Sequence, residues 1–477
     1  MINYYIKMLV IVFLLINCSQ KNKEHKTIAW NQKEEILKKT NPPKFKDIDF
    51  NIINYGAKGD NKFDNNTIIN KVILECNKSG GGKVIIPSGM FLCNGPINLK
   101  SNVNLYLKEG ATIKFGTNSN YYLPVVLTRF EGIECYNYSP LIRAFEEENI
   151  SITGKGTFDA QASIDNWWNW CGSKPDGWKK GMPSQLDSAG VPLLRKMNQN
   201  NVPVEKRIFG KGHYLRPNFF QPLRCKNILL SGVTFLNSPM WFIHPVESEN
   251  IIIKGVTVTG DGPNNDGCDP ESCKDVLIED CYFKTGDDCI AIKSGRNNDG
   301  RKIGKPSENI IIRNCKMEDG HGGVVIGSEI SGGCKNIFVE DCKMDSPYLL
   351  RAIRIKTNMH RGGTVENIYV RNVKIGEVSE AILKINLKYD SSGEGSGGNY
   401  LPIVKNIFFV NVTSEKSKYG LFVEGLPESK IKNITLQNCN FKNVKKGNIV
   451  NNTDGIVFNE SYMNNIPLQF KQNNNGK

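Results

Sequence analysis

The chain has 477 residues and a formal net charge of +13 at neutral pH. This positive excess is compatible with a polyanionic partner such as nucleic acid, anionic lipid or an acidic polysaccharide. The sequence contains no basic amphipathic helix, zinc-ligand spacing or aromatic RNA-binding strand, which argues against nucleic-acid binding.

The N-terminus predicts export. Lys7 precedes an apolar run over residues 8–16, which has the length of a signal-peptide core and is too short to span a bilayer. Leu15 stands three residues before Cys18, an arrangement that resembles the bacterial lipobox, so Cys18 is the predicted lipidation site. The alternative is a plain secretory signal with a different cleavage site. Residues 1–18 are interpreted as the signal peptide and residues 19–45 as a polar tether.

A capping helix is expected next. Residues 66–77 place Ile69, Val72, Ile73 and Cys76 at helical spacing. Three glycines then lead into the strand-like residues 83–86, and no Lys-Ser/Thr pair follows them, so they do not form a phosphate-binding loop. We expect the helix to cover the open end of a stack of strands, whose edge it would protect.

Residues 160–220 form a long insertion rich in tryptophan, proline and glycine. Long ordered loops are often functional. Tryptophan rings stack on sugars but also pack loops onto their scaffold, and the sequence favours neither interpretation. The tryptophans concerned are Trp167, Trp168, Trp170 and Trp178.

A seven-residue phrase recurs through the C-terminal two-thirds of the chain. It begins with Asn or Asp, continues with apolar residues and has Val or Cys in seventh place, and its starts lie between 23 and 39 residues apart. The copies begin at Asn227, Asn250, Asp275, Asn309, Asn336, Asn367, Asn406 and Asn433. Short β-branched runs such as 251–253 indicate strands, and one unit per coil predicts a parallel β-helix with insertions in its loops.

The cysteines in the seventh place are expected to be core thiols. They share their position with valines, which indicates an inward column of small apolar side chains, and a buried thiol packs as a small hydrophobe. The cysteines in this column are Cys281, Cys315, Cys342 and Cys439.

Four segments between residues 265 and 357 can be aligned on their apolar residues. The alignment puts Asp266 in the column of Asp288, and Asp287 in the column of His321. A third column contains Asp269, Ala291, Val325 and Arg354, and a fourth contains Glu271, Lys293, Gly327 and Lys356. Because Ile353 and Ile355 point inward, Arg354 and Lys356 point outward together.

These outward groups have the chemistry that glycoside hydrolysis needs. One carboxylic acid must protonate the leaving oxygen, while another carboxylate activates water or attacks carbon. Crowding of like charges keeps one carboxyl protonated near neutral pH. Arg354 and Lys356 together suit the carboxylate of an acidic sugar. The alternative is a turn cluster of Asp and Asn with surface ion pairs, which would not explain the whole set in register.

At this point the chain resembles family 28 of the glycoside hydrolases, the polygalacturonase family. The resemblance extends from about residue 50 to residue 460 and rests on the segments 264–266, 286–288, 320–322 and 354–356. It implies an all-β, right-handed parallel β-helix without a metal or other cofactor, and inverting hydrolysis of α-1,4-linked galacturonan in pectin. Asn265 departs from the family pattern, which more often has Thr there.

The resemblance also implies roles for individual residues. Asp287 would be the general acid, and Asp266 and Asp288 would activate the water. His321 would support the acid, and Arg354 and Lys356 would bind uronate. The substrate-binding set implied in this way contains Arg354, Lys356, Asn264 and His244, because residues 237–246 resemble the corresponding stretch of exo-acting members.

The expected partner is therefore an acidic polysaccharide, with membrane contact only through a lipid anchor, in the periplasm, at the outer membrane or at the cell surface. Decorated pectins or rhamnogalacturonan are alternative substrates. A calcium-dependent pectate lyase and a non-catalytic glycan-binding β-helix are alternatives of other classes. The catalytic domain is expected over residues 46–465, followed by a disordered tail over residues 466–477.

Overall fold

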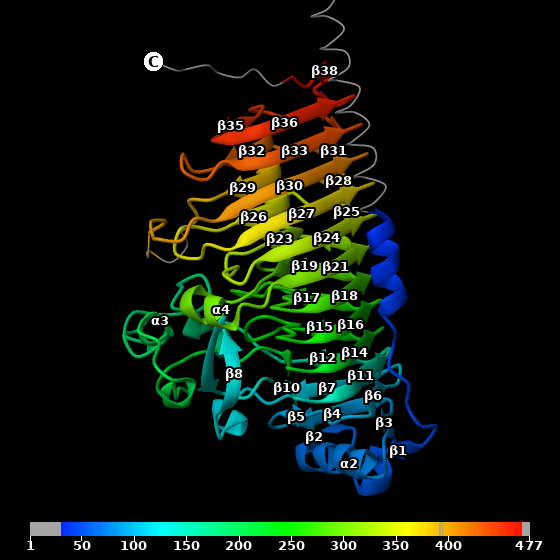
Figure 1. Ribbon diagram of the computed structural model, residues 1–477. Helices are drawn as coiled ribbons and strands as arrows, with labels where there is room; N and C mark the ends of the chain where they lie inside the picture. The colour runs from blue at the N-terminus through cyan, green and yellow to red at the C-terminus, as the bar shows by residue number, and fades with distance from the viewer. Residues whose placement is uncertain (1–29, 391–392, 394, 470–477) are drawn as a thin grey trace, which may run out of the picture.

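The computed structural model describes residues 30–390, 393 and 395–469, which form a right-handed parallel β-helix (Figure 1). Strands of successive coils pair in parallel and form three faces along the stack. Apolar side chains point into the shaft and form one core from Ile52 to Val444. The fold predicted from the repeats is confirmed.

The first face is a 13-stranded sheet. Its strands are β1 (Asp49–Asn51), β3 (Gly82–Ile86), β6 (Val103–Leu107), β11 (Glu148–Gly154), β14 (Lys226–Ser231), β16 (Glu249–Lys254), β18 (Lys274–Glu279), β21 (Ser307–Arg313), β24 (Cys334–Glu340), β27 (Thr364–Arg371), β30 (Ile403–Val410), β33 (Ile431–Gln437) and β36 (Thr453–Asn459).

The second face is a 14-stranded sheet. Its strands are β2 (Asp60–Asp64), β4 (Gly89–Cys93), β7 (Ala111–Phe115), β12 (Thr157–Asp159), β15 (Thr234–Leu236), β17 (Thr257–Gly260), β19 (Tyr282–Thr285), β22 (Lys316–Glu318), β25 (Lys343–Met344), β28 (Lys374–Glu377), β31 (Thr413–Lys416), β34 (Asn440–Phe441), β37 (Tyr462–Met463) and β38 (Ile466–Pro467).

The third face is divided. A three-stranded sheet contains β5 (Ile97–Asn98), β10 (Ile142–Phe145) and β13 (Phe220–Leu223), and a six-stranded sheet contains β20 (Ile290–Ile292), β23 (Val324–Ile326), β26 (Arg351–Lys356), β29 (Ala381–Asn386), β32 (Tyr419–Glu424) and β35 (Ile449–Asn451). Between them, the coils at residues 243–246 and 268–271 pair only through single bridges. The regular sheet is therefore interrupted on this face.

The first residue of each repeat phrase turns the corner into the first face. All eight of these residues adopt left-handed backbone conformations, with φ between 54° and 62°. Asn and Asp tolerate that region better than other side-chain-bearing residues, because their short polar groups bond locally. The apolar residues that follow then enter the strand in register, as Ile251, Val276 and Ile310 do in three successive coils.

The cysteine column packs as the sequence predicts. Cys281, Cys315 and Cys342 are buried thiols without disulfide bonds, and Cys439 is buried in the same core. These small side chains fill the corner that follows each strand of the first face.

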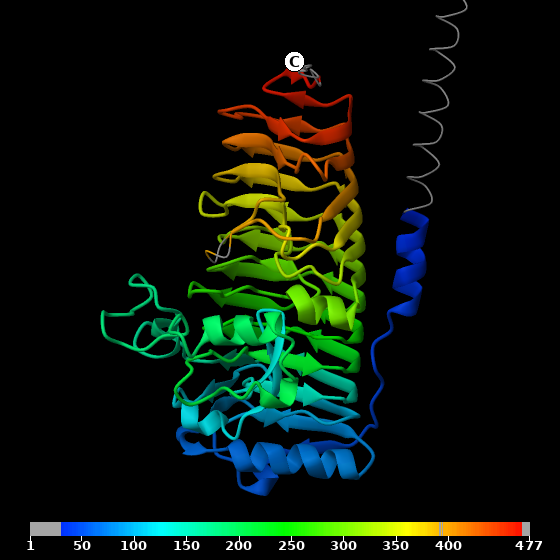
Figure 2. The ribbon, with the colours of Figure 1, turned by 60° about the vertical axis from the view of Figure 1, so that its left-hand side comes forward.

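Helices cover the N-terminal end and one flank of the stack. The predicted capping helix is α2 (Asn66–Lys78), whose Ile69, Val72 and Ile73 are fully buried at that end (Figure 2). The other helices are α3 (Val191–Gln199), α4 (Asn297–Ile303) and the short 3-10 turns η1 (Ile52–Tyr55), η2 (Ser119–Tyr122), η3 (Trp167–Cys171) and η4 (Val204–Lys206). None of the helices in the described ranges is long and apolar enough to cross a membrane.

The expectation of a free polar tether over residues 19–45 is wrong for its second half. Residues 30–39 form a helix that lies against the outside of the first face (Figure 2). Ile36 is buried there, the Trp30 ring packs at a tilt against Phe338, and Lys33 pairs with Glu340 at 2.8 Å. The apolar side of this short helix packs on a row of aromatic side chains on the sheet, Phe338, Tyr369 and Phe408. The overall polar composition of the segment gave no sign of this contact.

The predicted ends of the chain lie mostly outside the described residues. The signal peptide and Cys18 belong to residues 1–29, and most of the expected tail belongs to residues 470–477. Within the tail, residues 466–467 form β38, which pairs with β37 in antiparallel fashion. The repeat-containing domain begins at β1 and ends at that hairpin.

Candidate active site

The predicted columns are present on the third face. Cys268, Ile290, Val324 and Ile353 are bridged in register through four coils. This register places Asp266 level with Asp288, and Asp287 level with His321, as the alignment of apolar residues predicts. The three aspartates come from the two turns that enter the third face, one before the bridged Cys268 and one before β20.

The three aspartates meet at one point. Carboxylate oxygens of Asp266, Asp287 and Asp288 lie within 4.8 Å of one another. His321 Nδ1 is 2.8 Å from Asp287 Oδ1, and the Asp288 backbone N–H donates to that same oxygen at 3.0 Å. Asp266 and Asp288 are buried, whereas the His321 side chain is 50% exposed, so the cluster reaches solvent on the His321 side.

The basic pair of β26 faces this cluster. Lys356 Nζ is 2.7 Å from Asp288 Oδ2, and Arg354 Nη1 is 3.8 Å from Asp288 Oδ1. The ring of Tyr389 lies beside both cations, 5.3 Å from the Arg354 guanidinium and 5.4 Å from Lys356 Nζ. A sugar carboxylate placed here would meet two cations and an aromatic face.

The charges of the cluster shift its proton equilibria. Burial and then the carboxylate of Asp287 raise the pKa of Asp266 well above its usual range. Burial is the largest influence on Asp287 and opposes its ionisation, but the hydrogen bond with His321 and the charges of His321, Lys356 and Lys293 together outweigh it and lower the pKa of Asp287. The same bond raises the pKa of His321.

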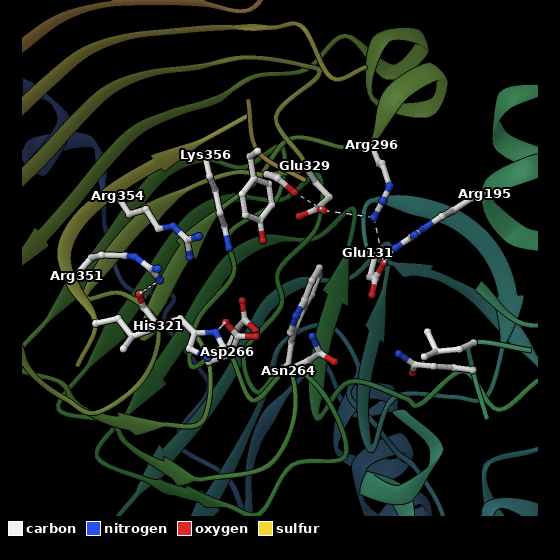
Figure 3. A pocket seen from close by; sticks show the side chains of 17 residues that line it. Glu131, Arg195, Asn264, Asp266, Arg296, His321, Glu329, Arg351, Arg354 and Lys356 are labelled. Atoms are coloured by element: carbon white, nitrogen blue, oxygen red, sulfur yellow. Dashed lines mark hydrogen bonds and ion pairs between the residues drawn. The ribbon is translucent and has the colours of Figure 1, made fainter. Parts of the chain in front are cut away.

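These residues line a pocket of about 630 Å³ (Figure 3). Figure 3 shows His321, Arg351, Arg354 and Lys356 on one side and Glu131, Arg195, Arg296 and Glu329 on the other. The full lining is Glu131, Gln185, Leu186, Arg195, Trp241, Asn264, Asp266, Asp287, Arg296, His321, Ser328, Glu329, Leu350, Arg351, Arg354, Lys356 and Tyr389.

One side of the pocket is a wall built from insertions. The hairpin of β8 (Val126–Phe130) and β9 (Ile133–Asn137) packs with α3 in a separate apolar cluster that includes Phe130, Leu194 and Trp241. Glu131 at the tip of the hairpin pairs with Arg195 of α3 and with Arg296, each at 3.1 Å. The wall thus bounds the pocket on the side opposite His321 and Arg354 (Figure 3).

The tryptophans of the insertion pack the loop and do not line the pocket. Trp167 is buried in the core, Trp168 Nε1 donates to the Ser238 carbonyl at 2.9 Å, and Trp178 Nε1 donates to the Met182 carbonyl at 2.8 Å. The insertion reaches the pocket through other residues, namely Gln185, Leu186 and Arg195.

The two remaining binding candidates differ. Asn264 lines the pocket, and its Oδ1 accepts a hydrogen bond from the buried Arg216 at 2.6 Å. His244 was a wrong prediction, because it is fully buried and absent from the pocket lining. Its Nε2 lies 2.8 Å from Glu271, and its Nδ1 lies 2.9 Å from Gln221, so both ring nitrogens have partners inside the protein.

Several pocket residues were not singled out from the sequence. Trp241, Arg296, Glu329 and Tyr389 line the pocket, and Lys293 lies directly beneath it. Lys293 was detectable, because it occupies the same outward column as Lys356. The others belong to loops and insertions, where periodicity carries no information about direction.

The acidic cluster has the oxygen ligands that a divalent cation prefers. Two ammonium groups already neutralise it, however, with Lys356 at 2.7 Å from Asp288 and Lys293 at 3.5 Å from Asp266. A divalent ion bound among the three aspartates would therefore have to overcome repulsion from both lysines.

Comparisons with known proteins agree with this chemistry. The model of the family "Glycosyl hydrolases family 28" matches residues 204–462, and that of "Rhamnogalacturonase A/epimerase, pectate lyase-like" matches residues 50–121. The structure of a hyperthermoactive exopolygalacturonase from Thermotoga maritima superimposes with a TM-score of 0.88 at 45% identity, over 92% of this chain and 97% of that one.

Curated relatives point the same way. A probable polygalacturonase of Vitis vinifera is 28% identical over 399 residues, which is 81% of this chain and 73% of the relative. An exo-poly-alpha-D-galacturonosidase of Dickeya chrysanthemi is 27% identical over 359 residues, which is 72% of this chain but only 58% of the relative.

Proposed function

Because this chain belongs to family 28 of the glycosyl hydrolases, we propose that it hydrolyses the galacturonide bonds of polygalacturonate from a chain end. The observation that carries the proposal is the joint placement of Asp266, Asp287, Arg354 and Lys356 in one pocket. Asp288 is buried beside them, in contact with Lys356 and within the same carboxylate cluster. The names of the Thermotoga maritima and Dickeya chrysanthemi proteins support both the substrate and the exo mode.

Asp287 acts as the general acid in this proposal. In the empty site it is paired with His321, and an anionic sugar entering beside it adds negative charge that favours the protonated carboxyl. Loading of the acid is thereby coupled to substrate binding. The proton passes from Asp287 to the glycosidic oxygen as the bond to the anomeric carbon breaks.

Asp266 and Asp288 activate the water. The water oxygen bonds to the anomeric carbon, and its proton passes to one of the two carboxylates, which regenerates the cluster after proton exchange. The carboxylate oxygens lie within 4.8 Å. Inverting pairs usually stand about 6.5–9.5 Å apart. We nevertheless propose inversion, on the ground that the chain belongs to family 28.

Arg354 and Lys356 bind the uronate at the cleavage site. Their position beside Asp288 puts a negative sugar carboxylate within reach of two cations. Glu131, Arg195 and Arg296 form a wall on one side of the pocket. We propose that this wall ends the substrate groove, so that a chain end fits better than the middle of a chain. This wall is the structural basis of the proposed exo action.

Product analysis on polygalacturonate, with and without excess chelator, tests the function. We expect monogalacturonate from the earliest time points and an unchanged rate in chelator. A ladder of oligomers would contradict exo action. Unsaturated, ultraviolet-absorbing ends that disappear with chelator would identify a lyase, and turnover only on rhamnogalacturonan would move the substrate to a decorated pectin.

We further propose that the protein is exported and anchored through a lipid on Cys18. The lipobox-like Leu15–Cys18 segment supports this, and no feature of the described residues bears on it. Expression with radiolabelled fatty acid in a bacterial host is the test. Label in the wild type but not in Cys18→Ala is expected, and a secreted, unlabelled wild type would contradict the anchor.

A further inference from the structure

A buried lysine lies beneath the floor of the pocket. Lys293 follows β20 directly, in the outward column that also contains Gly327 and Lys356. Its side chain is only 3% exposed, and it does not line the pocket. It nevertheless contacts residues that do line the pocket.

The ammonium group stands among three carboxylates. Lys293 Nζ is 3.5 Å from Asp266, 3.7 Å from Asp269 and 3.6 Å from Glu329. These distances exceed the about 2.7–3.2 Å of an N–H···O hydrogen bond. Lys356 differs in this respect, because it makes one short contact, of 2.7 Å, with Asp288.

An aromatic ring closes the fourth side. Lys293 Nζ lies 4.4 Å from the centroid of the Trp241 ring, within cation–π range. Trp241, Asp266 and Glu329 all line the pocket. One cation therefore holds three pocket residues from behind, and its charge reaches the site without contact with substrate.

The surrounding charges make this cation necessary. Asp269 is fully buried, and neither of its carboxylate oxygens has a hydrogen-bond partner among the described residues. Asp266 faces Asp287 and Asp288 as well as Lys293 and Lys356. Glu329 is shared with Arg296, whose Nη1 lies at 3.5 Å. Lys293 is thus the one cation in ion-pair distance of both Asp266 and Asp269 within the described part of the chain.

We propose that Lys293 is a positioning residue for the water-activating carboxylate: its ammonium holds Asp266 in the pocket floor and opposes protonation of that carboxylate. This rests on the proposed function, since it assigns Asp266 a role in that reaction. The proton of the cluster can bind to the carboxylate of Asp266 or to that of Asp287. Positive charge behind Asp266 disfavours protonation there and leaves the proton for Asp287, where the acid needs it.

The pKa shifts agree with this geometry. Burial alone would lower the pKa of Lys293, but the charges of Asp269 and then Asp266 raise it well above its usual range, so the ammonium form is maintained. Burial and the charge of Asp287 hold the pKa of Asp266 well above its usual range, and Lys293 is the largest of the influences that oppose this shift. Asp269 competes for the same ammonium, and its removal acts in the opposite direction to removal of Lys293.

The experiment compares Lys293→Met with Lys284→Met, a matched control whose lysine is half exposed and forms a surface ion pair with Asp319 at 3.7 Å. In pH profiles on polygalacturonate, Lys293→Met should lower kcat about 100-fold while KM stays nearly constant. The acid limb of the pH–activity profile of this variant should move to higher pH by about one unit or more, because Asp266 is protonated more easily without the ammonium. Lys284→Met should match the wild type in each respect.

Asp269→Asn supplies a second variant with the opposite sign. It removes a negative charge near Asp266, so the acid limb should move to lower pH. Loss of folding would not produce such a shift in the remaining active fraction. The proposal would be overturned if the acid limb of the pH–activity profile stayed unchanged in folded Lys293→Met and Asp269→Asn, or if it moved in the same direction in both. Should Lys293→Met not fold by circular dichroism, the direction of the Asp269→Asn shift decides alone.

A titration without substrate separates this inference from the proposed function. Carbon-13 shifts of labelled aspartate carboxyls, with Asp266 assigned from the signal lost in Asp266→Asn, report its proton directly. We expect a higher titration midpoint for Asp266 in Lys293→Met than in the wild type, and an equal midpoint would overturn the proposal. Absence of hydrolysis by the wild type would instead refute the proposed function.

Discussion

Two parts of the same solenoid treat buried polar groups in opposite ways. At the corner before the first face, asparagines stack in a ladder in which each Nδ2 donates to the Oδ1 of the coil before it. Examples are Asn336 to Asn309 at 3.1 Å and Asn367 to Asn336 at 3.1 Å. On the third face, charged groups crowd together, and oxygens of Asp266, Asp269 and Asp288 have no hydrogen-bond partner among the described residues.

The difference separates stability from chemistry. The ladder satisfies its polar groups with neutral amides and repeats from coil to coil, so it supports the stack and can be extended indefinitely. The third face keeps carboxylates poorly satisfied, which is costly in a buried setting. Such unsatisfied groups are able to bind water, a proton or a sugar, and this is the property that an active site requires.

The ladder also contains one exception, at Asp275, which has no amide to donate. In the preceding coil the same position is Asn250. Its Oδ1 accepts a hydrogen bond from the Asn41 backbone N–H at 3.1 Å, and its Nδ2 donates to the Asn41 carbonyl at 3.0 Å. The N-terminal segment therefore supplies the partners where the repeat does not. This segment continues from the helix over residues 30–39.

The largest difference between the ladder and the active site is expected when one aspartate in each is changed to asparagine. Asp287→Asn removes the acid, and kcat should fall about 10³-fold with little change in thermal stability. Asp275→Asn in the ladder should leave kcat unchanged. Rates on polygalacturonate and melting curves check both, and an Asp287→Asn enzyme of normal activity would show that another group donates the proton.

The next largest effect is a joint loss of stability and activity. Lys356→Met leaves the buried Asp288 without its 2.7 Å partner, and loss of one member of a buried pair costs about 3–5 kcal/mol of unfolding free energy. Activity should fall as well, since the uronate loses a cation. Urea unfolding and kinetics measure the two effects, with the half-exposed Lys343, changed to Met, as control.

Breaking the ladder should affect stability alone. Asn336→Ala leaves an acceptor on Asn309 and a donor on Asn367 unsatisfied, at a cost of about 1–3 kcal/mol. The kcat of the folded enzyme should not change. Urea unfolding tests the first statement and active-site titration tests the second, while a large loss of kcat without loss of stability would refute the separation.

The smallest expected effect concerns pH. Because its bond with Asp287 raises the pKa of His321, the imidazole should titrate above the usual value of about 6.5 in the folded protein. The stabilisation from this pair is complete below that value and is lost as pH rises through the folded pKa. Proton NMR should show the midpoint of His321 falling in Asp287→Asn, and an unchanged midpoint would mean that the pair is not formed in solution.

Sequence alone predicted those parts of the site that lie on regular coils. Asp266, Asp287, His321 and Arg354 could be placed because alternation of apolar residues sets the register of neighbouring strands. The prediction for His244 was wrong because it rested on the local resemblance of residues 237–246, which does not reveal that Glu271 and Gln221 enclose the imidazole inside the protein.

Contacts between distant segments were not predictable from periodicity. Glu131 and Arg296 are separated by 165 residues, and Lys33 and Glu340 by 307. Such pairs depend on how insertions fold back onto the shaft, and no repeat encodes that. The wall of the pocket and the docked N-terminal helix therefore emerged only from the structure.

The most direct test of the central claim is the anomeric form of the first product, followed by proton NMR during hydrolysis of fresh polygalacturonate. If Asp266, Asp287 and Asp288 act as one acid–base cluster on water, galacturonate should appear first as the β anomer, inverted from the α linkage. First appearance of the α anomer, or of an unsaturated sugar, would contradict this account.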